Sequence, residues 1–242
     1  MRAVLYDFDG LLIDSETAGL LSWKRVYAEF GQELDLAHWL CEIEAGRGPC
    51  MPTERLAELV AEPVDWEAVE RRRIGWRDEL LILRPGAVRH LEEARRLGFA
   101  TAIVSNAPDW WIGQRMDSAG IGPDSFDVIV CKAEGLARKP APDAYLAALR
   151  ELGCAAGDAL AYEDSPAGIR AALAAGIRCV AVPNMVTAHF DLSAADLVLP
   201  SLDARPLAEV AGALLAAGHP GLRGRSPGGR SPRPGPGGPA PR

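Results

Sequence analysis

Helical and strand-like segments alternate along the chain from residue 85 onward, and this alternation constrains the fold more than any other feature. Four predicted helices each end at a glycine, and a short apolar run of strand length follows each one. The helix–strand pairs are 87–97 with 100–104, 110–119 with 126–131, 142–152 with 159–162, and 167–175 with 178–182. Strands connected by helices through short links predict a mainly parallel, doubly wound α/β sheet.

A further strand is predicted near the start of the chain, where the apolar run 3–6 precedes Asp7 and Asp9. Side chains alternate along a strand, so these two carboxylates point the same way. Open α/β sheets bind their ligands at the carboxyl ends of strands, which is where this pair would lie. Because adjacent carboxylates repel each other, the pair implies a bound cation or different roles for the two acids.

Only helical spacing follows this strand, up to residue 83. Apolar residues recur every three or four positions from Leu20 to Phe30, and prolines separate further helical segments. The tail is built mostly from Pro, Gly, Arg and Ser, so we expect it to be disordered. The expected parts are an α/β core of residues 1–15 and 84–219, an inserted all-helical cap of residues 16–83, and the tail of residues 220–242.

The charge of the chain is unevenly distributed. Residues 220–242 hold five arginines and no acid, so the net charge of −7 becomes −12 for residues 1–219. Such an acidic body disfavours nonspecific nucleic-acid binding. No apolar run reaches the roughly 18 residues of a membrane helix, and the five cysteines form no CxxC pair. We expect a cytoplasmic monomer with reduced thiols, without a signal peptide, that binds neither nucleic acid nor membranes.

Polar residues follow four of the predicted strands. The clusters are Asp7 with Asp9, Ser105 with Asn106, Arg138 with Lys139, and Glu163 with Asp164 and Ser165. Each cluster alone has a structural explanation, such as a helix cap or a solvated loop charge. Because the carboxyl ends of parallel strands lie on one edge of a sheet, the four together favour one shared site.

These residue types suit phosphoryl transfer. A carboxylate can attack phosphorus and form an aspartyl-phosphate, and a second carboxylate can exchange protons with the leaving group and with water. Mg²⁺ prefers carboxylate and carbonyl oxygens. Lysine and hydroxyl or amide donors can bind the phosphate oxygens.

The four clusters, in this order and spacing, resemble the motifs of the haloacid dehalogenase superfamily across residues 3–200. The helical insert is similar to the cap of the branch that contains β-phosphoglucomutase and many small phosphatases. The resemblance implies that Asp7 is the nucleophile and Asp9 the general acid and base. It implies Mg²⁺ bound by Asp7, the Asp9 carbonyl, Asp164 and Glu163, and a phosphate bound by Ser105, Asn106 and Lys139.

The resemblance also places substrate selection in the cap. Arg47 lies in a Gly-Arg-Gly segment similar to the cap loop of this branch, and it is a candidate for substrate binding or simply a solvated arginine. Related mutases carry a histidine in the first cap helix where this chain has Gly19. We therefore favour a phosphatase for a small phosphomonoester, such as a sugar phosphate, over a phosphosugar mutase. A receiver-like signalling module is a third alternative, which Asp9 and the cap argue against.

Overall fold

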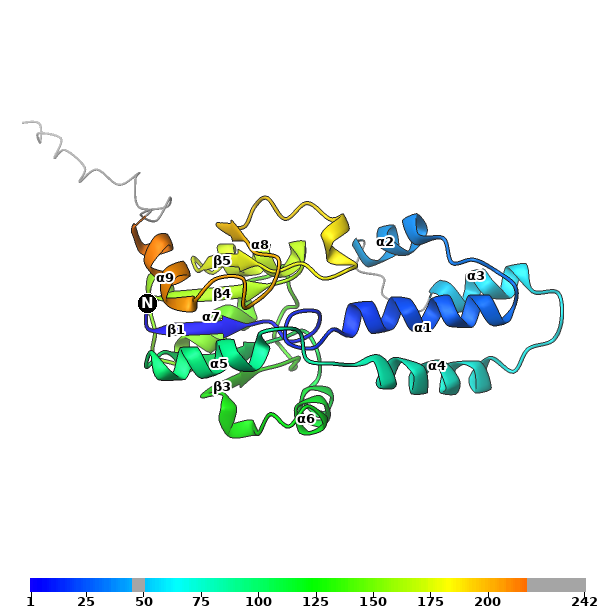
Figure 1. Cartoon of the computed structure of the whole chain (residues 1–242), viewed down its shortest axis with the longest axis horizontal. Helices are drawn as coiled ribbons and strands as arrows, with labels where there is room; N and C mark the ends of the chain where they lie inside the picture. The colour runs from blue at the N-terminus through cyan, green and yellow to red at the C-terminus, as the bar shows by residue number, and fades with distance from the viewer. Residues whose placement is uncertain (45–50, 217–242) are drawn as a thin grey trace, which may run out of the picture.

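A single parallel sheet forms the centre of the protein in its computed structural model, which describes residues 1–44 and 51–216. In the described residues its strand order is β3-β2-β1-β4-β5-β6, and every neighbouring pair is parallel (Figure 1). The strands are β1 (Ala3–Tyr6), β2 (Ala100–Val104), β3 (Val128–Val130), β4 (Ala159–Glu163), β5 (Arg178–Ala181) and β6 (Leu197–Val198). This topology confirms the predicted doubly wound α/β fold.

Helices cover both faces of the sheet because its strands are apolar on both sides. Val4 and Tyr6 of β1 belong to a buried cluster with residues of α5 (Ala87–Arg96), α6 (Asp109–Ser118) and α9 (Leu207–Ala216). Ala3 and Leu5 point the other way, into a second cluster with α7 (Asp143–Glu151) and α8 (Pro166–Ala174). The buried central position of β1 explains its continuous apolar sequence.

In the residues that the structure describes, four helices between β1 and α5 form the inserted cap, which lies beyond the end of the sheet (Figure 1). They are α1 (Ser15–Glu29), α2 (Leu36–Glu44), α3 (Met51–Leu59) and α4 (Trp66–Leu80). Helices α1 and α4 pack together, and the cap has its own apolar core, which includes Trp23, Leu56 and Val69. The periodicity that predicted helix from Leu20 to Phe30 reflects this packing.

Two short chain segments connect cap and core. Ile13 and Leu83 form an antiparallel bridge, the Asp14 amide donates to the Ile82 carbonyl at 2.9 Å, and the Arg84 amide donates to the Leu12 carbonyl at 2.9 Å. The buried Arg84 guanidinium also donates to the carbonyls of Gly10, Val182 and Pro183 at 2.7–2.9 Å. Hydrogen bonds from Arg84 therefore link the hinge to the loop after β1.

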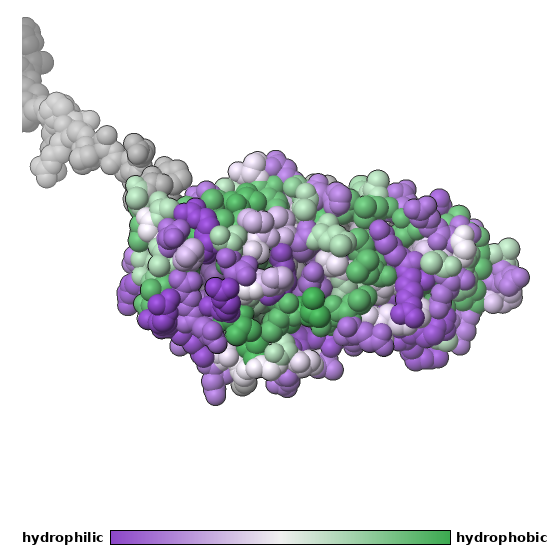
Figure 2. All heavy atoms as spheres, viewed as in Figure 1, coloured by the Kyte–Doolittle hydropathy of each residue, from purple (hydrophilic) through white to green (hydrophobic). Residues whose placement is uncertain are grey.

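Some expectations from sequence differ from the structure or lie outside it. The third strand of the sheet is Val128–Val130 rather than 126–131, because Phe126 packs in the core and Asp127 accepts a hydrogen bond from the Thr101 amide at 2.7 Å. Arg47 and the tail 220–242 lie outside the described residues. The face of the protein in Figure 2 carries hydrophilic and hydrophobic patches side by side. In the described part of the chain, no helix is long and apolar enough to cross a membrane.

Candidate active site

The carboxyl ends of β1, β2 and β4 lie side by side, and the residues that follow these strands meet at one pocket of about 540 Å³. The lining includes Asp7, Asp9, Ser105, Asn106, Lys139 and Asp164, together with Trp111, Lys132, Arg138 and Arg170. The buried Glu163 lies next to this lining, within hydrogen-bond distance of Lys139. The fold thus brings together four segments that are far apart in the sequence.

The Lys139 ammonium connects the nucleophile candidate to the fourth cluster. Its Nζ lies 2.6 Å from Asp7 Oδ1, 2.6 Å from Glu163 Oε1 and 2.7 Å from the Val104 carbonyl. Burial lowers the pKa of Lys139, but the carboxylates of Asp7 and Glu163 outweigh this and raise it. An ammonium has three N–H groups, and all three are used here. Lys139 therefore fixes Asp7 and supplies positive charge beneath it.

Three buried carboxylates, those of Asp7, Glu163 and Asp164, have oxygens within 4.8 Å of one another. Burial, followed by repulsion from Asp7, raises the pKa of both Glu163 and Asp164. Glu163 Oε2 is buried without a hydrogen-bond partner. An all-oxygen cluster with excess negative charge and an unpaired oxygen fits a hard divalent cation.

The surroundings of this cluster leave room only for glycine at two positions. A Cβ at Gly10 would lie 2.1 Å from Asp164 Oδ2, and one at Gly168 would lie 1.8 Å from Glu163 Oε2. Asn184 donates to Asp164 Oδ2 at 2.8 Å, while its own Oδ1 accepts from the amides of Val186 and Thr187. The amide orientation of Asn184 is thereby fixed, and so is the orientation of Asp164.

Asp9 occupies a different environment from Asp7. Its Oδ1 accepts a hydrogen bond of 3.0 Å from Trp111 Nε1. Burial and the neighbouring Asp7 carboxylate raise the pKa of Asp9 to about 6, although the hydrogen bond from Trp111 lowers it. A carboxyl group with a pKa near neutrality can both donate and accept a proton, which suits an acid–base catalyst.

Ser105 and Asn106 present donors to the pocket. Ser105 Oγ accepts from the Ala107 amide at 3.0 Å, and Asn106 Oδ1 accepts from the Lys139 amide at 2.9 Å. With their oxygens engaged as acceptors, the Ser105 hydroxyl proton and the Asn106 amide protons are left to donate. Such donors suit phosphate oxygens.

Sequence reasoning missed several residues that hold this site. From the sequence, Trp111 just after Asn106 could line the entrance of the site but is more readily interpreted as a helix anchor; in the structure it lines the pocket and contacts Asp9. Tyr145 lies on the buried face of α7, and its hydroxyl donates to Glu163 Oε1 at 2.6 Å. Arg84 and Asn184 come from segments without a motif, so only the three-dimensional structure identifies them. Glu16 also lines the pocket, where burial and then the nearby carboxylates raise its pKa to about 7.

The chain resembles known proteins over most of its length. The family model described as haloacid dehalogenase-like hydrolase matches residues 4–182. The plasmid protein CbbY of Cupriavidus necator is 36% identical, over 84% of this chain and 86% of that protein. Hexitol phosphatase A of Escherichia coli is 32% identical, over 84% of this chain and 92% of that protein. The structure of a hydrolase from Deinococcus radiodurans with bound phosphate and sodium has a TM-score of 0.73 and 29% identity, covering 90% and 96% of the two chains.

Proposed function

The chain belongs to the haloacid dehalogenase-like hydrolase family, and from this premise we propose that it is a Mg²⁺-dependent phosphatase that acts on a small sugar phosphate. The observation that carries the proposal is the contrast between Asp7 and Asp9. Asp7 is held by an ammonium at 2.6 Å, whereas Asp9 is held by a neutral indole. In this proposal the carboxylate paired with the ammonium attacks phosphorus, while the other carboxyl group exchanges protons.

The first half of the reaction forms an aspartyl-phosphate. An oxygen of Asp7 attacks phosphorus, the bond from phosphorus to the substrate oxygen breaks, and Asp9 donates its proton to that oxygen. In the second half Asp9 removes a proton from water, the water oxygen attacks phosphorus, and Asp7 is released as a carboxylate. Ser105 and Asn106 bind the phosphate oxygens throughout.

The carboxylates of Asp7, Glu163 and Asp164, with the Asp9 carbonyl, would hold Mg²⁺. When bound, the ion would neutralise charge on the transferring phosphate. The pocket lining adds Lys132, Arg138 and Arg170, which balance an anionic substrate in a protein with an acidic body. A sugar phosphate is favoured because hexitol phosphatase A is among the relatives.

Phosphate release from a panel of sugar and polyol phosphates, with Mg²⁺ and with EDTA, tests this function. We expect Mg²⁺-dependent release, and Asp7→Asn should reduce it at least a hundredfold, since nucleophile loss removes the covalent route. Asp117→Asn, the same change on the exposed surface of α6, is the matched control. An Asp7→Asn variant that keeps more than a tenth of the activity would exclude Asp7 as the nucleophile.

The same panel separates the alternatives. A mutase that is given a hexose 1-phosphate and a trace of bisphosphate would isomerise the substrate faster than it hydrolyses it. A phosphoenzyme that persists for hours would instead indicate a receiver-like module. Fast phosphate release without isomerisation supports the phosphatase.

A further inference from the structure

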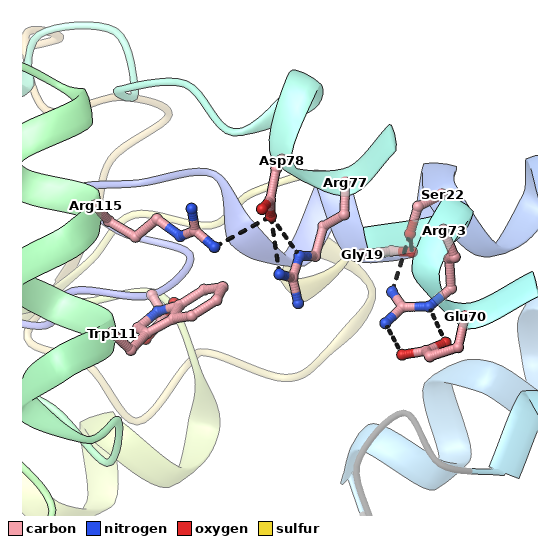
Figure 3. A network of polar contacts seen from close by, with 9 residues as sticks. Gly19, Ser22, Glu70, Arg73, Arg77, Asp78, Trp111 and Arg115 are labelled. Atoms are coloured by element: carbon pink, nitrogen blue, oxygen red, sulfur yellow. Dashed lines mark hydrogen bonds and ion pairs between the residues drawn. The ribbon is translucent and has the colours of Figure 1, made fainter. Parts of the chain in front are cut away.

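Cap and core touch through a cluster of charges between α4 and α6 (Figure 3). Asp78, near the end of cap helix α4, accepts hydrogen bonds from its neighbour Arg77 at 2.8 Å and from Arg115 of core helix α6 at 3.1 Å. The Arg115 side chain is only 9% exposed. A charge removed from water needs a partner of opposite sign. When the cap is seated, the Asp78 carboxylate is that partner for the Arg115 guanidinium.

Trp111 lies at the meeting point of this cluster and the active site. The guanidinium carbon of Arg115 lies 4.2 Å from the centroid of its ring, and that of Arg77 lies 4.8 Å away. At the other edge of the same indole, Nε1 donates to Asp9 Oδ1 at 3.0 Å. One side chain therefore contacts a cap residue, a core residue and the acid–base candidate.

We propose that Trp111 is a positioning residue that couples the seating of the cap to the orientation of the Asp9 carboxylate. This inference rests on the proposed function, in which Asp9 exchanges protons with the leaving group and with water. The indole N–H holds Oδ1 of the Asp9 carboxylate and so limits how this side chain can turn. The two arginines fix the indole through cation–π contacts, and Asp78 fixes the two arginines. When the cap is displaced, Arg77 leaves the ring and Arg115 loses its carboxylate partner, so the indole loses the restraints that the cap provides.

Leaving-group dependence isolates the contribution of Asp9 as an acid. An alkoxide must be protonated as it departs, whereas 4-nitrophenolate leaves without a proton. Trp111→Phe keeps the aromatic ring and removes the N–H. Its kcat/KM should fall about tenfold or more for the best sugar phosphate of the panel, but less than about threefold for 4-nitrophenyl phosphate. Equal losses for both substrates, or no loss, would overturn the positioning role.

The link to the cap is tested with substitutions on one helix. Asp78→Asn should reproduce the selective loss for the sugar phosphate, and Asp78→Glu, which keeps the charge, should restore part of it. Glu70→Gln is the matched control, because Glu70 pairs with Arg73 of the same helix and does not reach α6. The exposed fractions of the two acids are similar, at 36% for Asp78 and 43% for Glu70.

A readout without substrate keeps this inference separate from the proposed function. The chain has six tryptophans, and the Trp111→Phe spectrum identifies which indole ¹H–¹⁵N signal belongs to Trp111. That signal should shift in Asp9→Asn and in Asp78→Asn, and it should stay in place in Glu70→Gln. If the Trp111 signal does not shift in Asp78→Asn, the coupling is overturned whether or not the enzyme is a phosphatase. If the wild-type protein has no phosphatase activity, only the proposed function is refuted.

Discussion

His90 makes the stability of the core depend on pH. This histidine of α5 is 3% exposed, and its Nδ1 lies 2.8 Å from the Tyr6 hydroxyl, while its Nε2 is buried without a partner. Its ring also packs edge-on against Tyr162 at a centroid distance of 4.5 Å. Burial lowers the pKa of His90 from 6.5 to about 4, although the Glu93 carboxylate partly opposes this. The folded protein therefore keeps His90 neutral in a range where the unfolded chain protonates it.

The sign and size of the effect follow from linkage. Between pH 6.5 and pH 4 the unfolded state binds more protons at this position, so the free energy of unfolding falls as the pH falls. Between pH 7 and pH 5 the loss from His90 alone is about 2 kcal/mol, and below pH 4 the total loss levels off at about 3 kcal/mol. The buried carboxylates have raised pKa values and act in the opposite direction, so the effect must be isolated by substitution.

Urea unfolding of wild type and His90→Gln at pH 7 and pH 5 provides that isolation. Any pH-independent cost of the substitution cancels when the two pH values are compared. The contributions of the carboxylates cancel as well, because both proteins contain them. The destabilisation caused by His90→Gln should be smaller at pH 5 by about 2 kcal/mol. His38→Gln, on the exposed surface of α2, is the control and should show no such difference. If His90→Gln destabilises the protein equally at both pH values, the assignment of the low pKa to His90 is wrong.

Three further substitutions and one control substitution test the support of the site. Gly168→Ala places a methyl group against the fixed Glu163 carboxylate and should cost about 2 kcal/mol in urea unfolding and weaken Mg²⁺ binding in calorimetry. Gly212→Ala, a helical site with open space, should instead stabilise the protein slightly, and equal costs at both glycines would refute the contact. Arg84→Met removes the guanidinium donor from the carbonyls of Val182 and Pro183, while the Gly10 carbonyl keeps Asn184 Nδ2 as a donor at 3.2 Å; it should cost about 3 kcal/mol or more, as read from the urea midpoint, and a loss below half of that would mean water replaces the guanidinium. Ser165→Ala removes the cap of α8 and should lower stability by about 1 kcal/mol in thermal unfolding, whereas an unchanged Tm would show that the cap is dispensable.

Much of the fold was predictable because it depends on local patterns. The glycine-terminated helices and the apolar runs after them predicted a parallel sheet, and the polar residues after its strands predicted one edge as the site. Glu163 illustrates the limit of such patterns. Its place after a strand is visible in the sequence, but its partners Lys139 and Tyr145 are brought to it by tertiary packing.

Contacts between cap and core are the least visible in the sequence. Asp78, Arg115 and Trp111 each fit an ordinary helix surface or helix anchor by spacing. Their encounter depends on the angle at which the cap meets the core, and no periodicity within either part encodes that angle. The shortened strand Val128–Val130 has a similar cause, since the Asp127 side chain replaces a backbone partner at its start.

The paired connections at the hinge have a consequence for how the chain tolerates change. Because Ile13 and Leu83 form a bridge, the cap leaves and re-enters the core at one point, as a long loop would. The entropy of closing a loop grows only slowly with its length, so the sheet can fold around inserts of very different size. A cap grafted between these two hinge segments in place of the native one would meet the same reaction centre, so we expect that exchanging one contiguous piece of sequence changes the substrate.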